Sequence, residues 1–466
     1  MQRWAANRPR TARGRWLGLP ALMLAGLLAS CGGPALPFQH PDPGVLPIQQ
    51  GYNALLAQDV DRPSSATILQ AAYQGAVSAL TSAGIQDTTL RPPQLGSSAS
   101  DNWNAFLRAY GHITSTYEPR LTSSQLEYAV LNAMVTGLKD CQTNFFDPTA
   151  YAQRKAQLAG QQQFGGVGII LKDIPGHPTV LRVLTGPAQL AGLKPGDEIV
   201  AVNGKADAGE TFTQVRDEVR GTQGTTVRVT VQRPGVPAPL TFAVTRSQVQ
   251  PPTLEAAIIG GTIGYMHIYA FPPSVLQELD SALKTFDQRG VKGVVLDLRD
   301  NTGGDQQTVV SAIGRFVKAR TVELQVDRSG TRTPFTTKAT DYWKQPMPLA
   351  LLVDDGTVSG GEIFAKAFQE AHAGPIIGTP TGGCVSTAHT FALSDGSALD
   401  ISTATVLSGS GAPINRVGVT PDQVVPYPVD DLAAGRDPQL LAAFQALRGG
   451  PPVAGSSASL PSLNAG

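Results

Sequence analysis

Cysteine is scarce in this sequence, with three residues among 466, and only 15% of the residues are charged. The formal net charge is zero and there is no basic stripe, so we expect no nucleic-acid partner. The six histidines are scattered and no Cys-x-x-Cys pair occurs, so neither a metal site nor a cofactor is indicated. A length of 466 residues predicts two to four domains.

The first 31 residues have the pattern of an export signal. Five arginines in the first 15 residues precede a short apolar run, Leu17–Ala29, which Pro20 interrupts. The run ends in Leu-Ala-Ser-Cys31-Gly, which resembles a bacterial lipobox, whose cysteine becomes the lipidated N-terminus. The alternative is a plain secretory signal cut nearby. We therefore expect residues 1–31 to be a lipoprotein signal peptide and the chain to be anchored through Cys31 to a membrane of the bacterial cell envelope, facing the extracytoplasmic side. No later apolar run reaches the roughly 18 residues expected of a membrane span.

The next segments differ in composition. Residues 32–62 are rich in Pro, Gly and Gln and are predicted to form a tether, whereas 63–160 show helical periodicity, with helices over Ala66–Leu80 and Asp101–Tyr117 and a capping box at Thr122-Ser-Ser-Gln125. At the other end, 431–466 are predicted to hold a C-terminal helix and a disordered Gly/Ser/Pro/Ala-rich tail.

Short strands and glycine turns fill residues 163–248. The marks are Gly166-Val167-Gly168-Ile169, then Ala-Gly-Leu-Lys-Pro-Gly-Asp-Glu-Ile at 191–199 and Val-Asn-Gly at 202–204. This region resembles a PDZ domain of bacterial envelope proteases; the alternative is a generic half-barrel with a glycine loop. The resemblance implies that the amides of the loop formed by 166–169 hold the carboxylate of a protein or peptide C-terminal tail, and that a strand edge accepts the tail as an added strand.

Strands and helices alternate over residues 253–430, which predicts an α/β core. One buried strand ends in Asp297-Leu-Arg and leads to Gly303-Gly304, a pair that permits close backbone approach to a substrate. Another runs through a glycine turn to Ser359-Gly360, which opens a helix. On local pattern alone Ser359 is a helix N-cap. A phosphate loop is disfavoured because no Gly-Lys-Ser/Thr follows.

These two segments, together with 378–399, resemble the carboxyl-terminal processing peptidase (tail-specific protease) family of serine peptidases. The resemblance implies a multidomain α+β chain with an N-terminal helical region, a PDZ half-barrel and a crotonase/ClpP-like α/β peptidase core. It makes Ser359 the nucleophile and assigns the oxyanion hole to Gly303, Gly304 and Gly360.

The sequence departs from the family at the general base. The family has a lysine 25 residues after the serine and a supporting glutamine, and these positions hold Cys384 and Ala388 here. Some relatives use a histidine in the helical region, where this chain has Gln142. Among other candidates, Lys366 lies too far along the serine's own helix, and His389 is expected to be a surface or packing residue.

Cys141 and Cys384 both fall in segments that border the active site in this family. They either form a disulfide across the cleft or remain two separate buried thiols. Two functions stay open: an envelope serine endopeptidase that cleaves protein tails with an altered base, and a catalytically inactive PDZ-containing adaptor that binds tails.

Overall fold

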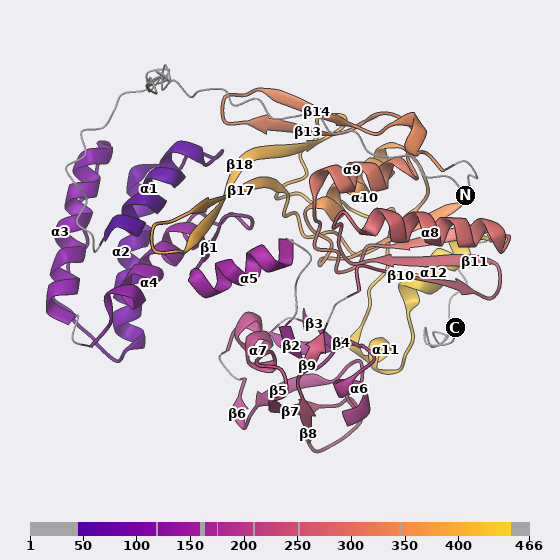
Figure 1. Ribbon diagram of the computed structural model, residues 1–466, viewed down its shortest axis with the longest axis horizontal. Coiled ribbons are helices and arrows are strands. Elements are labelled where there is room, and N and C mark those ends of the chain that lie inside the picture. Colours follow the sequence, from indigo (N-terminus) through magenta and orange to yellow (C-terminus); the bar gives the residue numbers. More distant parts are fainter. Residues whose placement is uncertain are drawn as a thin grey trace, which may run out of the picture. The chain divides into compact units, whose positions relative to one another are not determined.

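The computed structural model describes residues 45–117, 120–158, 164–174, 176–207, 210–249, 252–343 and 347–448 (Figure 1). The predicted signal peptide with Cys31, the tether up to residue 44 and the tail from residue 449 lie outside the described residues. No helix in the described ranges is both long and apolar enough to cross a membrane.

Four helices form the N-terminal region: α1 (Leu46–Gln58), α2 (Ser65–Ser82), α3 (Ala99–Tyr117) and α4 (Ser123–Thr136). The two helices and the Thr122/Gln125 capping box expected from the sequence are confirmed. The tether prediction is wrong for α1, because Ile48, Tyr52 and Leu55 recur at helical spacing and are fully or almost fully buried.

A five-stranded sheet joins this helical region to the later part of the chain. Its strands are β1 (Asn144–Phe146), β13 (Thr321–Asp327), β14 (Arg332–Thr336), β17 (Ser386–Ala392) and β18 (Ala398–Ser408). The order is β1-β18-β13-β14, with β17 also paired to β18, and helix α5 (Pro148–Leu158) follows β1. Leu399 and Ile401 of β18 belong to the same apolar cluster as helices α1–α4. The helical region therefore shares its core with the sheet.

The PDZ-like segment has its own apolar core, built on buried valines such as Val227, Val229 and Val231. Its elements are β2 (Phe164–Gly166), β3 (Ile169–Ile174), β4 (His177–Val183), α6 (Pro187–Ala191), β5 (Glu198–Val202), β6 (Lys205–Ala206), α7 (Phe212–Val219), β7 (Thr226–Gln232), β8 (Leu240–Thr245) and β9 (Ser247–Val249). The main sheet runs β3-β4-β5-β7-β8, so β3 is an edge strand.

A six-stranded sheet forms the centre of the α/β core. Its strands, in spatial order, are β10 (Leu254–Ile259), β11 (Ile263–Ile268), β12 (Gly293–Asp297), β15 (Leu349–Val353), β16 (Ile376–Gly378) and β19 (Gln423–Val424). From β11 to β19 neighbouring strands are parallel, and only β10 is antiparallel to its neighbour. The predicted α/β arrangement of this region is confirmed.

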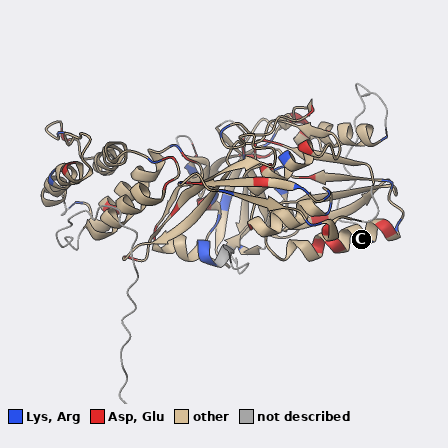
Figure 2. Ribbon diagram, turned by 90° about the horizontal axis from the view of Figure 1, so that it is seen from above, with Lys and Arg blue, Asp and Glu red and all other residues tan. Residues whose placement is uncertain are grey.

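Helices cover both faces of this sheet, which is why its central strands β11, β12 and β15 are almost entirely buried and mostly apolar. The covering helices are α8 (Val275–Gln288), α9 (Gln306–Gly314), α10 (Gly360–Glu370) and α12 (Pro438–Leu447), whereas the short α11 (Val429–Ala433) lies against Gly196 of the PDZ-like segment. One cluster contains Leu279, Val309 and Phe364, and the cluster on the opposite face contains Leu440 and Ala443 of α12. The C-terminal helix thus packs into the core. In Figure 2 blue and red segments are scattered along the ribbon, in keeping with the balanced charge.

Candidate active site

Ser359 stands at the turn between β15 and α10, in a backbone conformation unusual for a residue with a side chain. Its φ is 54° and its ψ is −123°, and although it occupies the N-cap position of α10, its side chain makes no capping hydrogen bond. Strained backbone of this kind costs roughly 1–3 kcal/mol and collects at functional sites. The hydroxyl is therefore held at a helix N-terminus without being used to cap it.

Gly303 and Gly304 lie against Ser359. A methyl group added to Gly303 would be 2.8 Å from Ser359 Oγ and 2.6 Å from the Gly360 nitrogen, so no side chain fits there. The Gly303 amide donates a 2.8 Å hydrogen bond to Asn301 Oδ1. The amides of Gly304 and Gly360, in contrast, donate to no described residue. Two unused N–H donors thus accompany the serine hydroxyl.

The two turns are tied together by one hydrogen bond between their backbones and one from the Thr357 side chain. The Val358 amide donates to the Asn301 carbonyl at 2.9 Å, and Thr357 Oγ1 donates to the Leu298 carbonyl at 2.7 Å. Asn301 also donates through Nδ2 to the Ile268 carbonyl at 2.6 Å. Because Asn301 and Thr357 are fully buried, these bonds fix the Gly303-Gly304 turn relative to Ser359.

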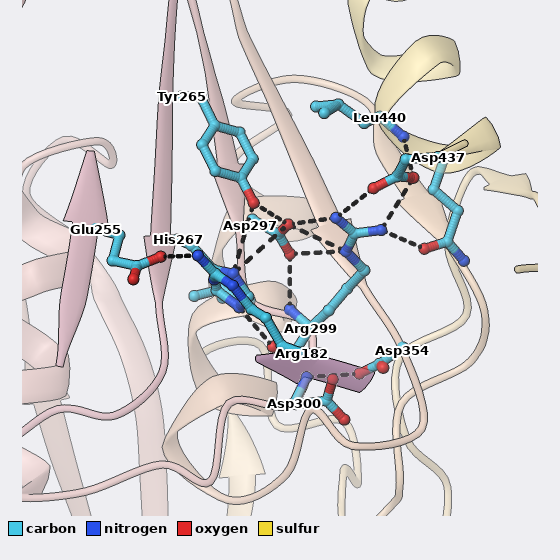
Figure 3. Close-up of polar contacts among 12 residues, drawn as sticks. Arg182, Glu255, Tyr265, His267, Asp297, Arg299, Asp300, Asp354, Asp437 and Leu440 are labelled. Atoms are coloured by element: carbon cyan, nitrogen blue, oxygen red, sulfur yellow. Dashed lines mark hydrogen bonds and ion pairs between the residues drawn. The ribbon is translucent and has the colours of Figure 1, made fainter. Parts of the chain in front are cut away.

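A buried ion network anchors the start of the glycine turn (Figure 3). The Arg299 guanidinium donates to both oxygens of Asp297, and it also pairs with Asp437 at 2.9 Å. Burial alone would raise the pKa of Asp297, but the adjacent Arg299 charge lowers it below its ordinary value. Asp437 also caps α12 through the Leu440 amide. The last strand residue of β12 and the C-terminal helix are therefore locked to each other.

The PDZ-like segment is linked to the peptidase core by two cations. Lys172 of β3 forms ion pairs with Asp354 and, at 3.3 Å, with Asp300. Burial and the nearby Asp354 raise the pKa of Asp300 to about 7, while Lys172 acts in the opposite direction. Arg182 of β4 pairs with Glu255 of β10 (Figure 3).

Cys384 is joined to Cys141 by a disulfide, with their Cα atoms 5.9 Å apart, so the pairing considered from the sequence is confirmed. The Ser359 amide donates to the Cys384 carbonyl at 2.9 Å, which places residue 384 directly beside the serine. Gln142 Nε2 donates to Cys384 Sγ at 3.2 Å and to its carbonyl at 3.3 Å. The three residues that the sequence predicted for the family's serine, lysine and histidine positions are thus brought together.

Glu362 is a functional candidate to which the sequence reasoning gave no role. Its fully buried carboxylate accepts hydrogen bonds from Thr381 Oγ1 (2.5 Å) and from the amides of Gly383 (2.7 Å) and Cys384 (2.8 Å). Burial raises the pKa of Glu362, and these donors counteract the rise. Glu362 therefore holds the segment that carries Cys384 against the first turn of α10. The sequence feature that could have indicated Glu362 is an acidic residue next to Ile363 and Phe364 in an otherwise apolar helix segment.

Three other candidates lie in ordinary surroundings. Ala388 is in β17, opposite Ser402 of β18. His389 is exposed and its Nδ1 is 2.6 Å from Thr403 Oγ1, which confirms it as a surface histidine. Lys366 donates to Gln369 along α10 at 2.8 Å.

The glycine loop of the PDZ-like segment leads into the edge strand β3. Gly168 has a φ of 83°, and the carbonyls of Val167 and Gly168 accept from Ala188 and Leu184. The amides of Val167 and Gly168 donate to no described residue. The loop therefore has N–H groups without a described acceptor, in buried residues next to the edge strand β3.

Comparison with known proteins agrees with this geometry. Residues 262–425 match the model of Peptidase family S41, and residues 179–233 match a PDZ domain. A carboxyl-terminal-processing protease of Synechocystis is 28% identical over 354 residues, covering 74% of this chain and 82% of the relative. The carboxy-terminal processing protease CtpA of Bacillus subtilis is 28% identical over 348 residues, covering 74% and 73%.

The fold is also found among solved structures. The photosystem II D1 C-terminal processing protease superposes with a TM-score of 0.56 at 24% identity, covering 85% of this chain and 97% of that one. Mature CPAF superposes with a TM-score of 0.53 at 11% identity, covering 87% and 98%. Taken with the family and relative matches, the chain is a serine-type peptidase of the carboxyl-terminal processing type, with a PDZ domain and a family S41 peptidase domain.

Proposed function

We propose that Ser359 is the nucleophile and that the amides of Gly304 and Gly360 form the oxyanion hole. The observation that carries this assignment is the uncapped, strained Ser359 beside two amides without a described acceptor. The sequence left Gly303 and Gly304 as equal candidates; the Asn301 side chain occupies the Gly303 amide and favours Gly304. Gly303 contributes by having no side chain.

The chemistry follows from this arrangement. Ser359 Oγ attacks a peptide carbonyl of the substrate, and the carbonyl oxygen becomes an oxyanion held by the Gly304 and Gly360 amides. The serine proton is transferred to the nitrogen of the scissile bond, the C–N bond breaks and departure of the amine leaves an acyl-enzyme. Water then hydrolyses the ester, which releases the acid and restores the Ser359 hydroxyl. The positive end of the α10 dipole favours the same developing charge.

The PDZ domain supplies the substrate in this proposal. The Val167 and Gly168 amides receive the terminal carboxylate of a protein tail, and the tail extends along the open edge of β3 as an added strand. Specificity for tails then comes from the free carboxylate, because an amidated end lacks the charge that these amides bind.

We further propose that the chain works outside the cytoplasm, held to a membrane by a lipid at Cys31. The signal-like N-terminal sequence supports this, as does the disulfide, since such bonds persist in oxidising compartments. The mostly parallel sheet covered by helices on both faces supports placing the peptidase core in the crotonase/ClpP-like class.

A second function, tail binding without cleavage, is favoured by one observation. Cys384 is bonded to Cys141, and Gln142 occupies the other family base position, so neither offers a strong proton acceptor to Ser359. If the chain works in this way, the PDZ domain binds protein tails and the peptidase domain does not cleave them.

Peptide cleavage tests the proposed function. A fluorescent peptide with a free apolar C-terminus is incubated with the unmodified chain, Ser359→Ala and Ser329→Ala, in oxidising and in reducing buffer. The nucleophile assignment requires that Ser359→Ala abolish cleavage while Ser329→Ala, an exposed turn serine, leaves it intact. Binding of the peptide without cleavage in both buffers supports the adaptor. An amidated peptide that is cleaved equally well contradicts tail recognition.

A further inference from the structure

The Cys141–Cys384 disulfide is formed by a residue, Cys384, whose backbone is hydrogen-bonded to that of Ser359. Residue 384 is held there by its carbonyl, which accepts from the Ser359 amide, and by its amide, which donates to Glu362 at 2.8 Å. Its sulfur faces a hydrogen-bond donor, Gln142 Nε2, at 3.2 Å. The backbone and side-chain contacts therefore fix Cys384 independently of the disulfide.

The oxidation state of Cys384 decides whether this sulfur can remove a proton. A disulfide sulfur uses both of its bonds and is at best a weak acceptor, whereas a thiolate is a base and is stabilised by N–H donors. The Gln142 amide is such a donor. Reduction would thus place an anionic proton acceptor where the bonded chain has none.

The two sulfur-bearing residues differ in their access to solvent. Cys141 is exposed, whereas Cys384 is partly buried. Thiol–disulfide exchange proceeds by attack of a thiolate on the accessible sulfur, and the other sulfur departs as a thiolate. Attack on Cys141 therefore releases Cys384 as the thiolate next to Gln142.

The surroundings of Cys141 are also held without the disulfide. Asp140 accepts hydrogen bonds from Ser402 Oγ and from Thr143 Oγ1, and β1 is paired with the start of β18. Both cysteines consequently stay near each other after reduction, so the bond can re-form.

We propose that the Cys141–Cys384 disulfide is a redox switch, in which reduction by a dithiol frees Cys384 as the thiolate that accepts the Ser359 proton. This inference rests on the proposed role of Ser359. The first thiolate of the dithiol attacks Cys141 Sγ and displaces the Cys384 thiolate. The second thiol of the reductant then releases Cys141 as a thiol and closes the reductant's own disulfide. Two electrons pass to the cysteine pair, and an external disulfide reverses the step.

A matched pair of variants separates the effect of a free thiol at residue 384 from the effect of breaking the disulfide. Cys141→Ser and Cys384→Ser both remove the disulfide, but only Cys141→Ser keeps a thiol at 384. The rate of labelling of Ser359 by a fluorophosphonate probe is measured for the full chain and both variants, with and without dithiothreitol. Denaturation curves check that each variant folds. If one variant does not fold, the labelling rates of the oxidised and the reduced unmodified chain are compared instead, and this comparison decides whether the switch exists.

The switch predicts that dithiothreitol raises labelling of the unmodified chain by about 100-fold or more, the lower end of what general base catalysis contributes. Cys141→Ser should match the reduced rate in either buffer, and Cys384→Ser should show no increase in labelling with dithiothreitol. Equal rates for the two variants, or for oxidised and reduced chain, overturn the switch but leave the nucleophile assignment intact. If no form is labelled at Ser359, both are overturned. Dithiol-dependent peptide cleavage that survives Ser359→Ala makes Cys384 itself the nucleophile and also overturns the switch.

Discussion

Replacing Gly303 by alanine adds one methyl group and tests how closely the Gly303-Gly304 turn approaches Ser359. The added methyl would lie 2.7 Å from Ser359 Cβ, 2.8 Å from its Oγ and 2.6 Å from the Gly360 nitrogen. Real Cβ contacts are longer, so either the serine or the oxyanion amide must move. Loss of a single oxyanion donor lowers kcat by about 100-fold to 1,000-fold. We expect Gly303→Ala to lose at least that much activity.

The same substitution also carries a backbone cost, which a matched control separates from the clash. Gly303 has a φ of 80°, and Gly261, in the turn between β10 and β11, has a φ of 72° with nothing within 4 Å of the place that an added methyl would take. Both alanine variants should lose about 1–2 kcal/mol of unfolding free energy from the left-handed backbone. Only Gly303→Ala should lose activity.

Two assays on the same samples decide this comparison. Urea denaturation gives the stability loss, and the fluorophosphonate labelling rate at Ser359 gives the activity, in whichever redox buffer supports labelling of the unmodified chain. Normal labelling of Gly303→Ala, or an equal loss in Gly261→Ala, would refute the close approach of this turn to the nucleophile.

Three further variants test the supporting structure. Glu362→Gln presents an amide N–H to backbone donors, so it should cost about 1–3 kcal/mol of unfolding free energy and slow Ser359 labelling, as urea denaturation and the probe would show. Cys141→Ser opens a loop of 243 residues and should lower the denaturation midpoint, with a chain-entropy loss of about 5 kcal/mol; an unchanged midpoint contradicts this. Burial, with a smaller contribution from Asp395, raises the pKa of Glu127 to about 7 from 4.5, so stability falls as the pH rises from about 4.5, and the full loss is reached above about pH 7. Glu127→Gln should therefore be more stable than the parent by roughly 1–3 kcal/mol at pH 8, and the difference should vanish below about pH 4.5.

Much of the site could be predicted from the sequence, because it depends on local patterns. A serine that opens a helix after an apolar strand, and a Gly-Gly turn after another, are visible as short motifs, and the parallel sheet brings their strand ends together. The choice between Gly303 and Gly304 could not be made, because it depends on where the Asn301 side chain points.

Long-range contacts account for the features that the sequence did not reveal. Helix α1 is stabilised by packing in the cluster that includes Leu399 and Ile401, far along the chain, whereas its composition alone resembles a linker. The role of Glu362 likewise arises from amides about 20 residues away, which no periodicity predicts.

The most direct test of Ser359 as the nucleophile is the location of a fluorophosphonate adduct. The full chain is labelled in oxidising and in reducing buffer, digested and mapped by mass spectrometry, with Ser359→Ala treated in parallel. We predict one adduct, on the peptide that contains Ser359, and none in the variant. An adduct on another serine, or equal labelling of Ser359→Ala, would contradict the assignment.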